Sequence, residues 1–246
     1  MYRKAARIVA VTEPLAAEIR TRYKLSPERV AVVPNGVDPD RFAPMDREEA
    51  RRRSVLVEGP LIVFVGNLAP WQGVDVLLRA MPAVLARHPT AKVAVVGQGE
   101  RRIALEDLTQ ELGLGDSVAF LGQVPHEHVP LVIGASTVGV VTSTRRMNER
   151  IGRSPLKAYE YLACARPIVA SDVPGIAELV AASGGGIAVP PDDPVAFADA
   201  LVRLLANPEE ARAMGDRGRR YVAEECSWAR TAERVERVLW GAVGES

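Results

Sequence analysis

The sequence predicts an α/β domain that is doubly wound around a mostly parallel sheet. Short apolar runs rich in β-branched residues recur along the chain, and stretches with apolar residues at helical spacing separate most of them. Runs that are apolar throughout indicate strands buried on both faces, and the helices between them indicate right-handed crossover connections. The runs lie at Ile8–Val11, Val30–Val33, Leu61–Val65, Val93–Val96, Val118–Leu121, Val138–Val141, Ile168–Ala170 and Ile187–Val189.

The composition is that of an ordinary globular protein. Of 246 residues, 48% are hydrophobic and 25% are charged, which is enough apolar material for a core. The formal net charge is zero, so nothing draws the chain as a whole to nucleic acid or to an anionic membrane. No apolar stretch approaches the roughly 20 residues of a membrane span. The start of the chain lacks the apolar core of a signal peptide, and we expect a cytoplasmic protein.

Cysteine and histidine form no recognisable metal or disulfide motif. Cys164 and Cys226 are far apart, so two reduced thiols are expected. His126 and His128 have no other ligand type clustered near them, which makes polar loop residues the simpler interpretation. Ser143 lies in no nucleophile elbow, and nothing supports a hydrolytic triad. We expect neither a metal ion nor a cofactor.

The order of these patterns divides the chain into three parts. Residues 1–40 contain a strand, a helix and a strand, and end near an Asn-Gly turn signal. Residues 41–225 begin with a polar connector and continue from about position 55 as a fresh series of strand and helix units. Residues 226–246 contain one more amphipathic helix, capped by Ser227. The middle part is therefore the main domain.

The most informative stretch runs from Ser154 to Asp172. Ser154 is a good N-cap residue, and Pro155 suits the first position of a helix. Lys157 follows in the first turn, where the helix dipole disfavours a cation unless an anion binds there too. Glu160 lies about one turn further along the same face, so the two side chains could hold a phosphate and a sugar hydroxyl together. A surface pair of Lys157 and Glu160 on an ordinary helix remains the alternative.

A second segment has the form strand, loop, helix. Gly66 and Asn67 follow the strand that ends at Val65, and a helix begins near Gly73. Two glycines in such a loop allow the backbone to approach a bound phosphate closely. A simple tight turn is the alternative.

The stretch that begins at Ser154 resembles the donor site of the group 1 glycosyltransferases, a family of retaining enzymes with the GT-B fold. In that family the second glutamate of a Glu-x7-Glu pattern binds the ribose of the nucleotide-sugar, and the helix start holds the diphosphate. Glu160 matches this glutamate, and Ser154, Pro155, Leu156 and Lys157 match the phosphate-facing turn. The resemblance implies Lys157 and Glu160 as catalytic residues, and the other three as donor-binding residues.

The loop after Val65 is similar to the family's Gly-Arg-Leu-x-x-x-Lys-Gly loop, whose arginine and lysine neutralise the diphosphate. The resemblance implies that Gly66, Asn67, Gln72 and Gly73 bind the donor, but Asn67 and Gln72 stand at the two charged positions. Either Lys157 and a neighbouring arginine supply the charge, or activity is weak or absent. The candidate arginines are Arg150 and Arg153.

A third departure concerns the sugar, and two further loops complete the resemblance. The first glutamate of the pair would fall at Gly152, and Glu149 is three residues out of register.

Leu121–Pro125 resembles the loop that cups the base, where the backbone of Gln123 and Val124 would contact the base edge. The loop Gly97-Gln98-Gly99 lacks the third glycine of a dinucleotide motif; it is expected to flank the donor or to form a plain turn.

The ends of the chain also resemble this family: the first 40 residues match the end of the acceptor-binding domain and the linker, and the last helix matches the helix that returns to that domain. We therefore expect the Rossmann-like C-terminal half of a GT-B enzyme, which binds a UDP- or GDP-sugar. A separate acceptor-domain chain or self-association would complete it, through apolar surface near Ile8–Val11 and Trp240. The alternatives are a non-catalytic nucleotide-sugar-binding fragment, and a sugar-nucleotide epimerase or phosphorylase of related topology.

Overall fold

The computed structural model describes residues 2–54, 59–148 and 150–243, and it confirms all eight predicted strands. The strands are β1 (Ile8–Ala10), β2 (Val30–Val32), β3 (Leu61–Val65), β4 (Lys92–Val96), β5 (Val118–Gly122), β6 (Val138–Val141), β7 (Ile168–Ser171) and β8 (Gly186–Val189). The α-helices are α1 (Glu13–Tyr23), α2 (Arg47–Ser54), α3 (Val74–Arg87), α4 (Arg102–Glu111), α5 (Val129–Ala135), α6 (Arg145–Asn148), α7 (Leu156–Ala163), α8 (Ile176–Ser183), α9 (Pro194–Ala206), α10 (Pro208–Glu225) and α11 (Trp228–Val243).

The main sheet has six parallel strands in the order β5-β4-β3-β6-β7-β8. The chain starts in the middle at β3, winds outward through β4 and β5, and then returns to the other side of β3 through β6. This reversal is the topological switch point of a doubly wound sheet, and ligands bind outside the carboxyl ends of the strands beside it. The predicted fold class, a parallel Rossmann-like sheet, is confirmed.

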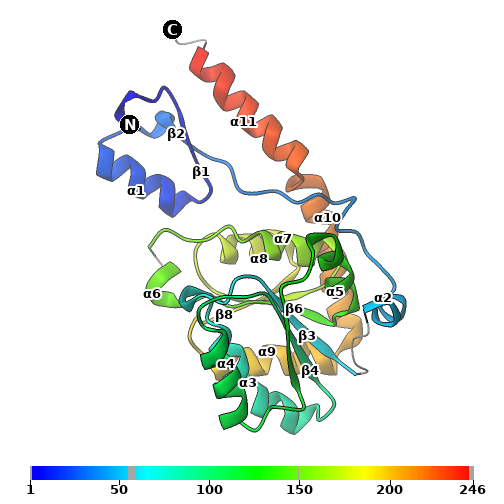
Figure 1. Cartoon of the computed structure of the whole chain (residues 1–246). Coiled ribbons are helices and arrows are strands. Elements are labelled where there is room, and N and C mark those ends of the chain that lie inside the picture. The colour runs from blue at the N-terminus through cyan, green and yellow to red at the C-terminus, as the bar shows by residue number, and fades with distance from the viewer. Residues whose placement is uncertain (1, 55–58, 149, 244–246) are drawn as a thin grey trace.

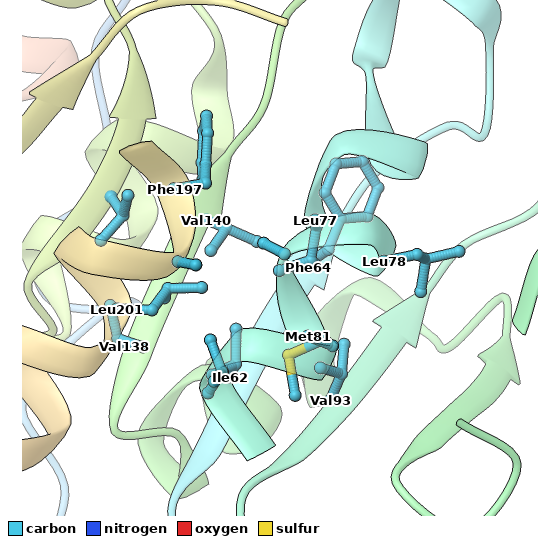
Figure 2. Packing of buried hydrophobic residues seen from close by; sticks show 14 of the residues in the cluster. Ile62, Phe64, Leu77, Leu78, Met81, Val93, Val138, Val140, Phe197 and Leu201 are labelled. Atoms are coloured by element: carbon cyan, nitrogen blue, oxygen red, sulfur yellow. The ribbon is translucent and has the colours of Figure 1, made fainter. Parts of the chain in front are cut away.

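Helices cover both faces of this sheet (Figure 1). Successive residues of β3 point to opposite faces: Ile62 and Phe64 pack with α3, α4 and α9, whereas Leu61 and Val63 pack with α5, α7 and α8. Figure 2 shows the first of these two clusters, in which Phe64 lies close to Leu77. Each fully buried side chain of this size contributes about 1.5–3 kcal/mol. The carboxyl end of β3 is therefore held from both sides.

The first strands form a small unit of their own, in which β1 and β2 pair in parallel beside α1. Ile8 and Ala10 are buried in its cluster, while Val9 on the other face of the strand and Val11 just after the strand are exposed. The expected apolar surface at positions 8–11 is therefore limited to the two alternate residues. The reason is the two-residue period of a strand, which turns Ile8 and Ala10 toward α1.

The linker and the last helix meet at one point. The N–H group of Val37 donates to the carbonyl oxygen of Cys226 (2.8 Å), and that of Trp228 donates to the carbonyl oxygen of Val37 (3.0 Å). The N–H of Arg230 donates to Oγ of Ser227 (3.2 Å), which confirms the predicted cap of α11. From this point α11 projects away from the domain (Figure 1). None of the described helices combines the length and the hydropathy that crossing a bilayer requires.

The end of α11 presents apolar side chains to solvent. Leu239 is 59% exposed and Trp240 is 67% exposed. The two exposed side chains are adjacent in the sequence, near the end of α11. The expected exposure near Trp240 is confirmed.

Candidate active site

The site lies where β3 and β6 end, because the loops after these strands meet at the switch point. Gly66 opens the loop after β3, and its N–H donates to the carbonyl oxygen of Val96 at the end of β4 (2.9 Å). A Cβ atom on Gly97 would lie 1.9 Å from the carbonyl oxygen of Gly66, and the φ of Gly97 is +134°. Gly97 is thus required for contact between two backbones, and the loop 97–99 flanks the β3 loop.

Lys157 joins the start of α7 to the β3 loop. Its Nζ atom donates a hydrogen bond to Oε1 of Gln72 (2.9 Å) and lies 3.8 Å from the centre of the Phe64 ring. A Cβ atom on Gly66 would lie 2.9 Å from the same Nζ atom. Lys157 is only 8% exposed. The alternative of a surface pair between Lys157 and Glu160 is therefore wrong, because the lysine is buried and bonded to the loop.

Burial sets the electrostatics of this lysine. It lowers the pKa of Lys157 to about 7, and the nearby carboxylate of Glu160 raises it in opposition. A lysine with this pKa is poised between its charged and neutral forms at neutral pH. An anion bound beside Nζ would favour the charged form, so this position responds to ligand charge.

Glu160 lies one turn further along α7, with its side chain 14% exposed. Burial raises the pKa of Glu160, and the charges of His126, Lys157 and Arg41 oppose that effect. Its Oε1 atom is 3.8 Å from Nε2 of His126, whose ring packs edge-on against Phe42. His126 was treated in the sequence as a polar loop residue, and no local pattern announced its place beside Glu160.

The start of α7 differs from the sequence prediction. The helix begins at Leu156, Pro155 is the N-cap residue with extended backbone, and no side chain caps the helix. Oγ of Ser154 instead accepts the N–H of Asn35 (3.2 Å) and lies 3.0 Å from the hydroxyl of Tyr159. The prediction of Ser154 as N-cap and Pro155 as first helical residue is wrong, because the linker competes for the serine hydroxyl. Leu156 is exposed at the helix start.

Gly152 stands where the resemblance places a glutamate, and its backbone admits no such side chain. Its φ is +68°, and a Cβ atom would lie 2.6 Å from the carbonyl oxygen of Pro174. Glu149 lies outside the described residues. Arg150 is exposed and points to the small N-terminal unit, where it lies 3.8 Å from Oε1 of Glu18.

Arg153 is held by a buried amide that the sequence did not single out. Its Nε atom donates to Oδ1 of Asn148, and Nδ2 of Asn148 donates to the carbonyl oxygens of Trp71 (3.1 Å) and Thr144 (2.6 Å). Asn148 is fully buried. This network ties the loop after β6 to the loop after β3.

The remaining predicted residues lie around this centre. Gly73 has left-handed backbone and precedes α3, beside Thr144. Asn67 is exposed near the start of the β3 loop. Gln123 and Val124 follow β5, and they precede the short helical turn that begins at His126. Gln123 is exposed, and Val124 packs partly against the core.

Two cavities lie at opposite ends of the main sheet. One of about 330 Å³ lies between the β3 loop, the residues before α7 and the N-terminal unit. A larger one of about 800 Å³ lies near α2 and the start of α10, and none of the predicted site residues lines it. The smaller cavity is the relevant one, because it borders the residues at the switch point. Its lining includes Trp71, Gln72, Asn148, Gly152, Arg153 and Ser154.

A doubly wound parallel sheet with a glycine loop and a buried lysine at its switch point is typical of α/β domains that bind a ligand at the carboxyl ends of their strands. Comparison with known families places it further. The family described as Glycosyl transferases group 1 matches residues 46–221, and Glycosyltransferase Family 4 matches residues 1–41. The chain belongs to the group 1 glycosyltransferases.

Curated relatives are longer than this chain. A D-inositol 3-phosphate glycosyltransferase of Salinispora tropica is 37% identical over 258 residues, which covers 98% of this chain and 52% of the relative. An uncharacterized glycosyltransferase of Methanocaldococcus jannaschii is 30% identical over 240 residues, with 96% and 60% coverage. The chain thus spans about half to three fifths of the length of these relatives.

Solved structures share the fold. A sucrose-phosphate synthase from Thermosynechococcus elongatus has a TM-score of 0.83 at 30% identity, over 99% of this chain and 60% of that one. The Anabaena protein HepE in complex with UDP has a TM-score of 0.84 at 19% identity, over 98% and 65%. The C-terminal domain of a group 1 protein from Francisella tularensis has a TM-score of 0.69 at 20% identity, over 78% and 99%. The latter two establish the fold alone.

Proposed function

We propose that this chain is the donor-binding half of a retaining glycosyltransferase that uses a UDP- or GDP-sugar. The observation that carries the proposal is the position of Lys157. Gln72 replaces the lysine that the family pattern has in the β3 loop, and Nζ of Lys157 lies 2.9 Å from Oε1 of Gln72. The chain therefore has a cation at the loop although the loop contains none. HepE, with the same fold, was solved with UDP and with UDP-glucose.

The chemistry follows from the charge that develops in the reaction. As the bond between sugar and diphosphate breaks, negative charge builds on the leaving nucleoside diphosphate. Lys157 and the N–H groups at the start of α7 would stabilise that charge, and their fixed positions make the stabilisation effective. Glu160 would hold the ribose hydroxyls through charge-assisted hydrogen bonds.

Sugar transfer also needs an acceptor-binding part. The exposed Leu239 and Trp240 on α11 and the exposed face of β1 would pack against it. This part would come from a longer protein or from a separate chain. We expect the 246-residue chain alone to transfer no sugar to added acceptors. A transfer assay measures this when it is corrected for hydrolysis of the donor. Robust transfer by the chain alone would contradict the half-enzyme view.

Ligand-dependent melting tests the nucleotide site. At a free concentration 100 times the dissociation constant, UDP or GDP should stabilise the chain by about 2.7 kcal/mol, a readily measured shift in melting temperature. NAD should have no such effect, since the loop Gly97-Gln98-Gly99 lacks the third glycine of a dinucleotide motif. A melting temperature that no nucleoside diphosphate shifts would reject the proposal.

A second candidate is a nucleotide-sugar-binding chain without transfer activity. The backbone at Gly152 favours it, because no carboxylate can reach the transferred sugar from that position. Mixing the chain with the acceptor half of a related enzyme distinguishes the two. Turnover in the mixture would exclude the non-catalytic alternative.

A further inference from the structure

The cavity of about 330 Å³ at the switch point lies next to the proposed position of the diphosphate. Gln72, which accepts the hydrogen bond from Lys157, lines it, and so does Pro155 at the start of α7. Glu160, Lys157 and this cavity follow one another in that order. The ribose, the diphosphate and the sugar of a nucleotide-sugar are joined in the same order. On the proposed function, on which this inference rests, the cavity receives the transferred sugar.

The charge of this cavity is unusual for a neutral sugar. Among its described lining residues, Arg153 is the one charged side chain, and there is no carboxylate. Carboxylates are the strong acceptors for the O–H groups of a neutral hexose. At Gly152 the backbone excludes such a group, since a Cβ atom would lie 2.6 Å from the carbonyl oxygen of Pro174. The lining of the cavity therefore contains a guanidinium group and no carboxylate, whereas a carboxylate would be the better partner for a neutral sugar.

The guanidinium of Arg153 is presented in one orientation. Asn148 is fully buried, and its Nδ2 atom donates to two carbonyl oxygens, of Trp71 and Thr144. This fixes the amide so that Oδ1 faces Arg153 and accepts its Nε–H. Within the described part of the chain the guanidinium forms no ion pair, unlike the guanidinium of Arg150, which faces Glu18. Its terminal N–H groups form a planar fork that matches a carboxylate.

We propose that the sugar transferred from this donor carries a carboxylate, so that the substrate is a nucleoside-diphosphate hexuronic acid. Arg153 binds the sugar carboxylate through its terminal N–H groups, and Asn148 positions Arg153. The pairing replaces hydrogen bonds to neutral hydroxyls by an ionic contact, and it selects for charge at the sugar.

Calorimetric titration of the whole chain tests this proposal with two matched sets of ligands. The first set is UDP, UDP-glucose and UDP-glucuronic acid; the second is GDP, GDP-mannose and GDP-mannuronic acid. We expect the uronic acid to bind at least about tenfold more tightly than the neutral sugar on the preferred base, from one charge-assisted contact. Arg153→Gln should abolish that preference and leave UDP or GDP within about twofold. Arg153→Lys should retain part of it, because the charge remains.

The control is Arg146→Gln, which removes a nearby exposed arginine on α6 and should leave all affinities unchanged. Melting curves establish that each variant is folded. Equal losses for the diphosphate, the neutral sugar and the uronic acid in Arg153→Gln would overturn the inference, because Arg153 would then contact the phosphates. Absence of any preference in the wild-type chain would also overturn it. A wild-type chain that binds neither UDP nor GDP would instead reject the proposed function, since neither ligand contains the sugar.

Discussion

Two segments meet at the switch point, and they differ in what they can offer an anion. The β3 loop from Gly66 to Gly73 has closely packed backbone but neutral side chains at Asn67 and Gln72. The start of α7 contributes Lys157, whose amine reaches into the β3 loop and is buried there. The charge and the backbone cradle thus come from different elements. For an anion-binding site, the position of the positive charge matters more than the helix or loop that carries it.

The largest effect should follow from removal of the charge. Lys157→Ala should weaken UDP or GDP binding by about 2–5 kcal/mol, the usual cost of truncating one partner of a buried charge pair. Uridine or guanosine should bind almost as before, because neither has phosphate. Calorimetric titration measures both, and Lys92→Ala, on a lysine remote from the site, is the control. Equal losses for nucleoside and diphosphate would mean that the phosphate lies elsewhere.

The other functional group on α7 should give the opposite ligand pattern. If Glu160 accepts hydrogen bonds from ribose, Glu160→Gln should weaken nucleoside and diphosphate alike, by roughly 1.5–3 kcal/mol. The same titrations with uridine, UDP, guanosine and GDP measure the loss. The exposed Glu178, at the start of α8, provides the matched control Glu178→Gln. Unchanged affinity in Glu160→Gln would remove the ribose contact from this chain.

The buried lysine should also make binding depend on pH. The free protein holds the pKa of Lys157 at about 7, and a bound diphosphate raises it, so binding above pH 7 takes up a proton. UDP affinity should fall as pH rises above 7, by at most about 1.4 kcal/mol per pH unit. Titration in buffers of different ionisation enthalpy measures the uptake. Lys157→Ala should take up none, and uptake that persists in this variant would assign the proton to another group.

The same pKa has a consequence for stability. Because the folded-state pKa of Lys157 is depressed below the usual value of 10.5, the unfolded chain binds more protons between pH 7 and 10.5. Lys157 therefore makes stability rise with pH across that range, and below pH 7 the full cost of burying the charge is present. Denaturant unfolding of the wild type and Lys157→Ala at several pH values should reveal this slope in the wild type only.

A smaller effect tests whether the two segments are coupled. The hydroxyl of Tyr161 on α7 accepts the N–H of Val65 at the root of the β3 loop (2.8 Å), and the side chain is fully buried. Tyr161→Phe leaves that N–H unsatisfied and should cost roughly 1 kcal/mol in stability. It should weaken UDP by less than Lys157→Ala does, since the loop remains packed against Gly97. A loss as large as that of Lys157→Ala would mean that loop position outweighs charge.

The sequence was sufficient for the fold because its strands are apolar throughout. Burial on both faces leaves a continuous β-branched run such as Leu61–Val65, which a short window detects. Gly66 and Glu160 could be singled out for a different reason, because each stands at a fixed offset in a segment that resembles the family's donor site. All of these features depend on near neighbours in the sequence.

The parts that were missed depend on contacts between distant residues. Ser154 is a favoured residue type for an N-cap, yet its hydroxyl accepts from Asn35, 119 residues away. The partner of Lys157 is 85 residues away at Gln72. The need for glycine at position 152 follows from its positive φ and from its contact with the carbonyl of Pro174. No window on the sequence contains these pairs, so local propensity fixes the elements and tertiary packing decides their side-chain partners.

The meeting of Val37 with Ser227 has a consequence for engineering. The segment between these residues begins and ends at one place, where its two ends are joined by hydrogen bonds of 2.8 and 3.0 Å. A unit with adjoining ends adds little loop-closure entropy when it is inserted into another protein, because its host needs to bridge only a short gap. The same geometry permits circular permutation: a short peptide can join the ends while new termini open in an exposed loop. Residues 37–227 should therefore be transplantable as one folded unit.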